Sequence, residues 1–349
     1  MSDRYRMIDF PSERFDQLVA DLLNPTTIND KRNRSFRNIL TLLSARLNAK
    51  SVLVEENYID VDYLSMYSGW YAAAFKPHSA LTTRLHFFKK IGVRLEDVRD
   101  GAIEQLGYLG YVVVTPLTCG RIGRTLITSW QGAIDIAGQP HKPRFLSARS
   151  VVHLYGRRFS AEGSPFITQD ALTIACAQAS IWMTSRFVHL KYGRYGAPRH
   201  LPHGITESAS HNLTWAGRLL PTDGLTVIQV INAFVNLGHF PVYHSWKCKD
   251  LAEREKALSW IVRYLDSDLP VMLTLPGPQH AVVAIGQLSA TKRRVAVPTT
   301  KRLVTSDAWV GGLAINDDGP GPYLIMPRNV DEYTALESGP DSARVPPTT

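Results

Sequence analysis

Apolar residues recur at three- and four-residue spacing in several stretches of the chain, and this spacing predicts helices with one buried face. The first such stretch contains Phe36, Ile39, Leu40, Leu43 and Leu47. Further helices are predicted over residues 95–106, from 176 onward, over 226–237 and over 251–265. The helix at 226–237 has two candidate N-caps, Thr226 and Asp223, because a hydroxyl or carboxylate can accept a hydrogen bond from a free backbone N–H.

Short runs rich in β-branched and aromatic residues predict strands. In the first part of the chain they span residues 51–54, 111–114, 125–128 and 144–154. After residue 265 only strand signals follow, at 271–275, 280–285, 309–315 and 323–326. Pro and Gly separate these last runs, which favours successive antiparallel strands.

The order of these elements predicts an α+β protein with two domains. We expect a mixed α/β N-terminal domain over residues 1–150 and a second domain over 151–335, in which helices precede an antiparallel sheet. Turn formers and charged residues at 138–143 precede the boundary, and a Gly-, Pro- and His-rich stretch at 193–204 predicts a loop. The tail at 336–349 cannot bury enough apolar surface to offset its chain entropy, so we expect it to be disordered.

Composition narrows the class of protein. The chain contains no uninterrupted apolar run of about 18 residues and begins with charged residues, so we expect a cytoplasmic protein without a membrane segment. Its three cysteines, Cys119, Cys176 and Cys248, are scattered and form no CxxC pair. This excludes a disulfide framework and a cysteine zinc site.

The formal charge of +8 is spread over short basic groups such as residues 31–34, 157–158 and 292–294. A solvated surface explains them. Nucleic acid is the less favoured partner, because binding phosphates requires basic side chains gathered on one face.

Three residues in one chain order indicate nucleophilic chemistry. Cys176 opens a predicted helix, His280 opens a predicted strand, and Asp317 precedes a glycine turn near another strand. A thiol attacks as the thiolate, and a helix N-terminus and a neighbouring imidazolium both lower a thiol pKa. A histidine on a strand can face the thiol while a carboxylate on the adjacent strand holds one imidazole tautomer.

The carboxylate is not uniquely assigned by this pattern. Side chains alternate across a strand, so Asn316 and Asp318 share a face that Asp317 does not. Either Asp317 or a member of that pair orients His280.

These segments resemble the papain-like cysteine peptidases, nearest the branch that contains the double-glycine-leader peptidases. The resemblance covers roughly residues 160–328. It rests on Thr168-Gln169 upstream of Cys176-Ala-Gln-Ala, on Leu269-Pro-Val-Met-Leu leading to Gln279-His280-Ala-Val-Val-Ala-Ile-Gly286, and on Ile315-Asn-Asp-Asp-Gly-Pro-Gly-Pro-Tyr323.

The resemblance implies a cofactor-free hydrolase, with no metal, that cleaves a peptide, amide or isopeptide bond in a peptide or protein substrate. Cys176 would attack the carbonyl carbon, His280 would accept and later donate the proton, and Asp317 would orient the imidazole. Gln169 would donate to the oxyanion, although it lies seven residues before the cysteine where the family has six. Gln178, the other nearby amide, points to a different helix face.

Other functions use the same features. An acyl or amine transferase would employ the same triad, and an inactive papain-like relative would only bind protein or nucleic acid. Such binding would involve either the short basic groups or the aromatic and acidic residues between 55 and 88. The alternative interpretation of the residues between 55 and 88 is a core in which tyrosine hydroxyls and Arg84 satisfy buried carboxylates. This N-terminal part resembles an uncharacterised region of bacterial proteins that carry papain-like C-terminal domains.

Two further patterns give only weak evidence of a ligand site. The histidines His189, His200, His203 and His211 lack a cysteine or carboxylate at ligand spacing, so a loop is favoured over a metal site. The glycines of residues 120–125 predict a turn between strands, because the lysine of a phosphate-binding P-loop is missing.

Overall fold

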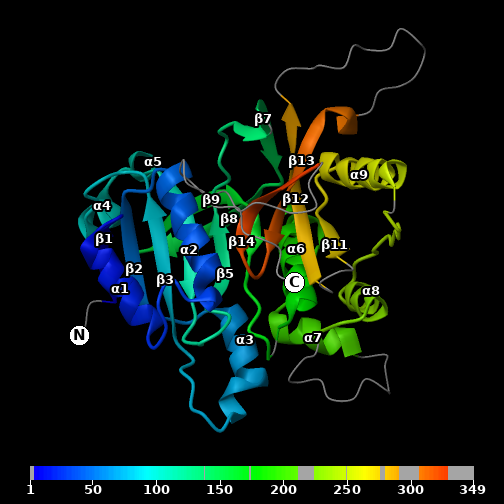
Figure 1. Cartoon of the computed structure of the whole chain (residues 1–349). Coiled ribbons are helices and arrows are strands. Elements are labelled where there is room, and N and C mark those ends of the chain that lie inside the picture. Colours follow the sequence, from blue (N-terminus) through cyan, green and yellow to red (C-terminus); the bar gives the residue numbers. More distant parts are fainter. Residues whose placement is uncertain are drawn as a thin grey trace.

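The computed structural model describes residues 4–136, 138–172, 174–210, 224–248, 250–275, 280–290 and 306–328. Within them, helices and antiparallel sheets form an α+β protein, which confirms the predicted class (Figure 1). The predicted disordered tail, the basic group at 292–294 and His211 lie outside the described residues.

The described part of the chain contains two six-stranded β-sheets. The first sheet has the order β1-β2-β3-β4-β5-β10, and the second has the order β14-β13-β12-β7-β6, with β11 paired to β12. All of these pairs are antiparallel. Strands β8 and β9 form a separate hairpin.

The bounds of the strands are β1 Tyr5–Asp9, β2 Ser51–Tyr58, β3 Thr82–Phe88, β4 Tyr108–Val114, β5 Ile122–Ile127, β6 Ile134–Ile136, β7 Gln139–Phe145, β8 Ala148–Leu154, β9 Arg157–Gly163, β10 Pro165–Phe166, β11 Val271–Leu275, β12 His280–Ala290, β13 Val310–Asp317 and β14 Gly321–Pro327. The four strands predicted after residue 265 are thus β11 to β14. Their predicted antiparallel pairing is confirmed.

The bounds of the α-helices are α1 Glu13–Leu23, α2 Arg34–Thr41, α3 Val61–Gly69, α4 Leu95–Asp100, α5 Ile103–Leu106, α6 Cys176–Tyr192, α7 Pro202–Ser210, α8 Val227–Asn236 and α9 Leu251–Asp266. Thr226 is the N-cap of α8, because its hydroxyl accepts from the Gln229 N–H. None of the described helices is long and apolar enough to cross a bilayer.

Three local predictions are corrected. The helix predicted over 95–106 is interrupted at Gly101, so α4 and α5 are separate. The 193–204 stretch is not wholly a loop, because α7 begins at Pro202, and proline is well suited to the first helical position, where no N–H is needed. The strand predicted over 144–154 is divided between β7 and β8.

The turn formers at 138–143 contribute to a strand, β7, despite two prolines. Burial alternates along this segment, with His141 and Pro143 buried and Lys142 and Arg144 exposed. Pairing with β12 on one side and β6 on the other supplies the tertiary contacts that override the turn propensity.

Strands from both sides of residue 150 join each sheet. β6 and β7 lie with β12 in the second sheet, and β10 pairs with β5 in the first. One apolar cluster contains Val52 of the first sheet, Trp182 of α6 and Ile325 of the second. The sheets therefore share a core, and the domain boundary near residue 150 remains a prediction.

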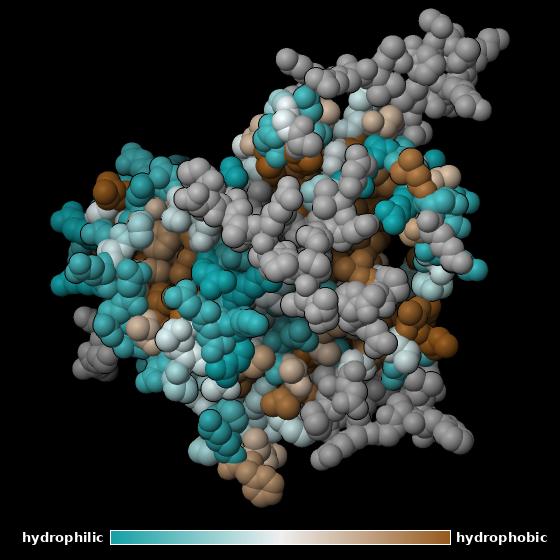
Figure 2. All heavy atoms as spheres, in the orientation of Figure 1, coloured by the Kyte–Doolittle hydropathy of each residue, from teal (hydrophilic) through white to brown (hydrophobic). Residues whose placement is uncertain are grey.

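The surface is unevenly apolar. Figure 2 shows hydrophilic side chains over much of the N-terminal half on this face and brown, hydrophobic patches nearer α8 and α9. Among the described residues, the exposed large apolar side chains in that region include Val227, Ile228, Val235, Phe240, Val242, Tyr243 and Leu251.

Candidate active site

Cys176 is the first residue of α6. Its predecessor Ala175 has extended backbone, and the Ala175 N–H donates to Oε1 of Gln178 at 3.3 Å, so a side chain in the first turn satisfies the end of the helix. Cys176 itself is half-buried. The thiol therefore lies at the positive end of the α6 helix dipole.

His280 opens β12, and α6 packs against that strand. The Cys176 side chain lies near enough to the imidazole to raise its pKa. One turn along α6, the buried hydroxyl of Ser180 donates to the Ala281 carbonyl at 3.1 Å. This bond links the nucleophile helix to the strand directly beside the histidine, so the thiol and the imidazole are held by one short structural unit.

Asp317 binds the far side of the imidazole. Its Oδ1 atom lies 2.9 Å from Nε2 of His280 and accepts from the Gly319 N–H at 2.9 Å. The carboxylate has no exposed surface. Because Nε2 is engaged by Asp317, Nδ1 is the nitrogen left to exchange a proton with the thiol.

The alternation that grouped Asn316 with Asp318 is broken by an irregularity in strand pairing. The register between β13 and β14 shifts between Ile315 and Asp317. Asn316 donates to the Pro165 carbonyl at 3.1 Å and accepts from the Tyr323 N–H at 3.1 Å, so it holds β10 and β14. Asp317 and Asp318 both approach His280, which is the change in side-chain direction that a bulge produces.

The surroundings of His280 favour its charged form. The hydrogen bond to Asp317, then the neighbouring Cys176 side chain, raises the pKa of His280 to about 10, against the opposing effect of burial. The imidazole is therefore protonated at neutral pH. An imidazolium beside a thiol stabilises the thiolate, so the geometry and the charge favour the same reactive pair.

Asp318 is a second, unusual carboxyl in this cluster. It is 1% exposed, its Oδ1 lies 3.9 Å from Nε2 of His280, and neither oxygen has a hydrogen-bond partner among the described residues. Burial, then the charge of Asp317, raises the pKa of Asp318 to about 7, while His280 and nearby backbone amides oppose the rise. Sequence reasoning treated Asp318 only as a substitute for Asp317.

The two glutamines have different surroundings. The Gln178 side chain is buried and bound to the Ala175 N–H, as part of the helix cap. Gln169 is half-buried, and its backbone amide lies beside the Asp318 carboxyl. Its main chain therefore borders the site, and the oxyanion role of its side chain remains a prediction.

The metal-binding capacity of the site is limited by its own hydrogen bonds. In the described part of the chain, His280, Asp317 and Asp318 form the group whose ligand atoms lie within 4.8 Å of one another. A divalent cation between them would have to replace the bond that joins His280 to Asp317. Among the other histidines, His189 bonds to the Ala197 carbonyl, and the rings of His200 and His239 lie 5.5 Å apart.

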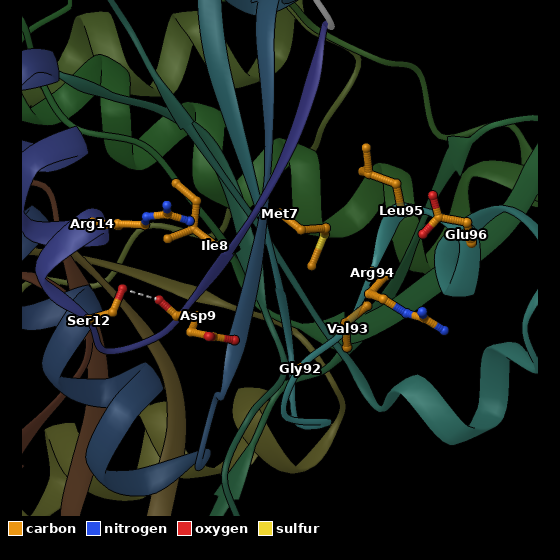
Figure 3. Close-up of a pocket in the computed structure, with 10 residues that line it drawn as sticks. All are labelled: Met7, Ile8, Asp9, Ser12, Arg14, Gly92, Val93, Arg94, Leu95 and Glu96. Carbon is orange, nitrogen blue, oxygen red and sulfur yellow. Dashed lines mark hydrogen bonds between the residues drawn. The ribbon is translucent and has the colours of Figure 1, made fainter.

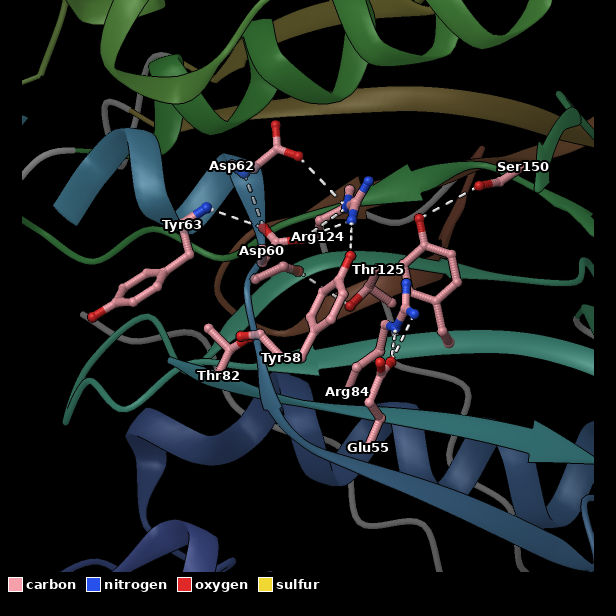
Figure 4. A network of polar contacts seen from close by, with 12 residues as sticks. Glu55, Tyr58, Asp60, Asp62, Tyr63, Thr82, Arg84, Arg124, Thr125 and Ser150 are labelled. Atoms are coloured by element: carbon pink, nitrogen blue, oxygen red, sulfur yellow. Dashed lines mark hydrogen bonds and ion pairs between the residues drawn. The ribbon is translucent and has the colours of Figure 1, made fainter. Parts of the chain in front are cut away.

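Within the aromatic and acidic region of residues 55–88, a group of charged side chains that includes Glu55, Asp60 and Arg84 is buried (Figure 4). Arg84 lies 2.7 Å from Glu55, and Arg124 lies 2.8 Å from Asp60, the N-cap of α3. The hydroxyl of Tyr58 accepts from Arg124 at 2.7 Å. These contacts agree with the reading in which tyrosines and arginines satisfy buried carboxylates.

The same group of buried charged side chains reaches the nucleophile helix through Asp62 of α3. Its carboxylate accepts from Nε1 of Trp182 at 3.0 Å and pairs with Arg186, both on α6. Arg199 adds a longer contact at 3.2 Å. The N-terminal half therefore binds α6 through a buried charged network.

One cavity among the described residues lies away from this chemistry. A space of about 520 Å³ lies between β1, the start of α1 and the start of α4, and charged residues Asp9, Arg14, Arg94 and Glu96 contribute to its walls (Figure 3). None of its lining residues belongs to the Cys176 site. We give more weight to the Cys176 cluster, because it combines a nucleophile, an acid–base group and an orienting carboxylate.

Sequence reasoning missed Asp170 and its partner Tyr71. Asp170 is 3% exposed, and its carboxylate accepts a hydrogen bond from the Tyr71 hydroxyl at 2.7 Å. The two residues are 99 positions apart in the sequence. The available signal was an Asx turn, since an aspartate ahead of a helix accepts from backbone N–H groups that follow it. The tyrosine partner had no local signal.

Comparison of the chain with protein-family models, with curated proteins and with solved structures found no match. The resemblance to papain-like peptidases therefore stays an inference from the residues around Cys176, His280 and Asp317.

Proposed function

We propose that this protein is a cysteine-dependent hydrolase that cleaves a peptide, amide or isopeptide bond, with Cys176 as nucleophile. The observation that carries the proposal is His280, which hydrogen-bonds with a fully buried carboxylate, Asp317, and whose pKa is raised by the neighbouring Cys176 side chain. Nucleophile, base and orienting group thus lie next to one another, which is the arrangement that activates a thiol.

In the first half-reaction, the Cys176 thiolate adds to the carbonyl carbon of the substrate. The tetrahedral intermediate then collapses as the imidazolium of His280 gives its proton to the leaving amine, which leaves a thioester on Cys176 and a neutral imidazole. Asp317 keeps the imidazole in the orientation that the transfer requires.

In the second half-reaction, His280 removes a proton from water as the water attacks the thioester. The carboxylic acid product departs, and the regenerated thiolate faces an imidazolium again. The backbone N–H of Cys176 at the start of α6 would stabilise the oxyanion, with the side-chain amide of Gln169 as the proposed second donor.

The papain-like assignment belongs to the same proposal. Its support is the order of a nucleophile helix, α6, followed by the antiparallel strands β11 to β14, with the thiol at the helix start and the imidazole at the start of a strand. A peptide or protein is the substrate class that this chemistry favours.

The test is the pH dependence of iodoacetamide labelling, read at each cysteine by mass spectrometry. We expect Cys176 to label well below the ordinary thiol pKa of about 8.5 and to lose this reactivity in the His280→Ala variant. Cys119 and Cys248 serve as internal controls in the same sample. If Cys176 labels no more readily than Cys248 at acidic pH in the wild type, the activated pair does not exist.

Turnover is tested with a peptide library and the Cys176→Ala variant. Cleavage by the wild type and none by the variant supports the hydrolase. Equal cleavage by both rejects Cys176 as the nucleophile.

A further inference from the structure

The main chain that leads into Cys176 is folded around the carboxylate of Asp170. Oδ1 of Asp170 accepts from the N–H groups of Leu172 at 3.0 Å and Ile174 at 2.8 Å, and the Asp170 N–H donates to the Ile174 carbonyl at 3.1 Å. We call residues 169–175 the Asp170 loop, of which Thr173 lies outside the described residues. One buried side chain thus binds two backbone N–H groups of this loop.

The second oxygen of that carboxylate is held from the N-terminal half. Tyr71 lies in the short 3-10 turn Tyr71–Ala73 after α3, and its hydroxyl donates to Oδ2 of Asp170 at 2.7 Å. Both residues are 3% exposed. Burial and the charge of Asp170 raise the pKa of Tyr71, so the hydroxyl remains a donor throughout the physiological range.

A turn of the N-terminal sheet touches the same loop. Gly120 lies between β4 and β5 with φ at +68°, and a Cβ there would meet the Asp170 Cα at 2.7 Å and the Gln169 carbonyl oxygen at 2.8 Å. Only glycine permits this approach. Just before the loop, the Thr168 N–H donates to the Ile122 carbonyl of β5 at 2.9 Å, which anchors the segment to the first sheet.

The two ends of the Asp170 loop border the reacting groups. At one end, the Gln169 backbone amide lies beside Asp318, the carboxyl 3.9 Å from His280. At the other end, Ala175 and Cys176 begin α6. A change in the loop would therefore displace the thiol and the backbone N–H at the helix start.

We propose that Tyr71 and Gly120 are positioning residues for the Cys176 site, and that they act through Asp170. This inference rests on the proposed function. It assigns to the N-terminal half the positioning of the catalytic cysteine. Tyr71 and Gly120 touch no reacting atom. They hold the loop that presents the nucleophile, so the two halves of the chain complete one site.

The variants are Tyr71→Phe and the matched control Tyr63→Phe. Each removes one hydroxyl from a buried tyrosine near the same helix, but the Tyr63 hydroxyl donates to the Ser79 carbonyl at 2.8 Å and not to the Asp170 loop. Asp170→Asn is a second variant, which keeps the side-chain size and removes the charge.

Two measurements on the full chain test separately whether Tyr71 holds the Asp170 loop and whether that loop positions Cys176. Hydrogen–deuterium exchange at the Leu172 and Ile174 amides reports the loop itself. We expect exchange about tenfold faster in Tyr71→Phe, because a hydrogen bond to a charged group is lost, and no change in Tyr63→Phe. Asp170→Asn should also accelerate it.

The pH profile of Cys176 alkylation reports the positioning. We expect its midpoint to move to higher pH in Tyr71→Phe and to stay at the wild-type value in Tyr63→Phe, since a displaced helix start stabilises the thiolate less. Unchanged loop exchange in Tyr71→Phe would overturn the inference. Faster exchange with an unchanged alkylation profile would also overturn it, since the contact would then be structural only.

A failure of the proposed function can be distinguished from a failure of this inference. A wild-type Cys176 that labels like an ordinary thiol would reject the hydrolase, whatever the variants do. The exchange rates of Tyr71→Phe and Tyr63→Phe would still decide whether the hydroxyl of Tyr71 holds the Asp170 loop.

Discussion

Nε2 of His280 lies 2.9 Å from Oδ1 of Asp317, a carboxylate with no exposed surface, while the neighbouring Cys176 side chain also raises the pKa of this imidazole. The bond to Asp317 gives the imidazole a defined orientation. The reactivity expected of Cys176 depends on this pair more than on the cysteine alone, because a helix N-terminus by itself supplies only part of the thiolate stabilisation.

The first prediction concerns the orienting carboxylate. Asp317→Ala should lower the rate of hydrolysis by about 10²-fold or more, because the imidazole loses the partner that holds it for proton transfer. Steady-state kinetics on a cleaved peptide measure the loss, and circular dichroism checks the fold. Asp318→Ala is the comparison, with a smaller loss expected from its longer distance; a larger loss in Asp318→Ala would exchange the two roles.

The second prediction is a pH dependence of stability that originates at His280. Its pKa is raised from 6.5 to about 10 in the folded protein, so the native state binds the proton more tightly than the unfolded chain. The stability it contributes is fully present below pH 6.5 and is lost as the pH rises through 10.

Urea unfolding of wild type and His280→Gln at pH 6, 8 and 10.5 tests this dependence. The difference in free energy of unfolding should be greatest at pH 6 and smallest at pH 10.5. A difference that is constant across the range would show that His280 does not change its proton affinity on folding.

The third prediction concerns Asp318, whose effect on stability has the same sign as that of His280. Its pKa is raised from 3.8 to about 7, so between these values the native state binds more protons than the unfolded chain, and stability falls as the pH rises. Asp318→Asn removes this titration. Urea unfolding of both proteins at pH 3.5 and pH 8 measures the effect. The urea midpoint of the variant minus that of the wild type should be more positive at pH 8 than at pH 3.5.

The fourth prediction concerns the buried link between α3 and α6. Asp62→Ala should destabilise the protein by about 3–5 kcal/mol, because it leaves Arg186 buried without its carboxylate and removes the acceptor of the Trp182 N–H. Asp30→Ala, which breaks an exposed pair with Arg32, is the control and should cost far less. Equal losses in the two variants would mean that solvent screens the Asp62 network.

Local patterns predicted much of the fold. The β-branched runs after residue 265 form β11 to β14, and the amphipathic stretches at 226–237 and 251–265 form α8 and α9. In β12, β13 and β14 the burial of apolar residues agrees with local propensity, whereas Val235 of α8 and Leu251 of α9 are exposed although their spacing predicted a buried face. Patterns were less informative where they conflicted with tertiary contacts, as in β7, where pairing with β12 overrides two prolines.

The candidate site divides in the same way. The sequence by itself determined that a thiol begins a helix, that an imidazole begins a strand and that a carboxylate pair follows in a turn, because each depends on residues close together in the chain. Only the tertiary structure showed that Asp317, and not Asn316, contacts His280. The reason is that a register shift of β13 against β14 interrupts the alternation of side chains on which the sequence argument relied. Only the tertiary structure joined Tyr71 to Asp170 across 99 residues, because a contact between distant segments depends on how two sheets pack and leaves no periodic trace in either segment.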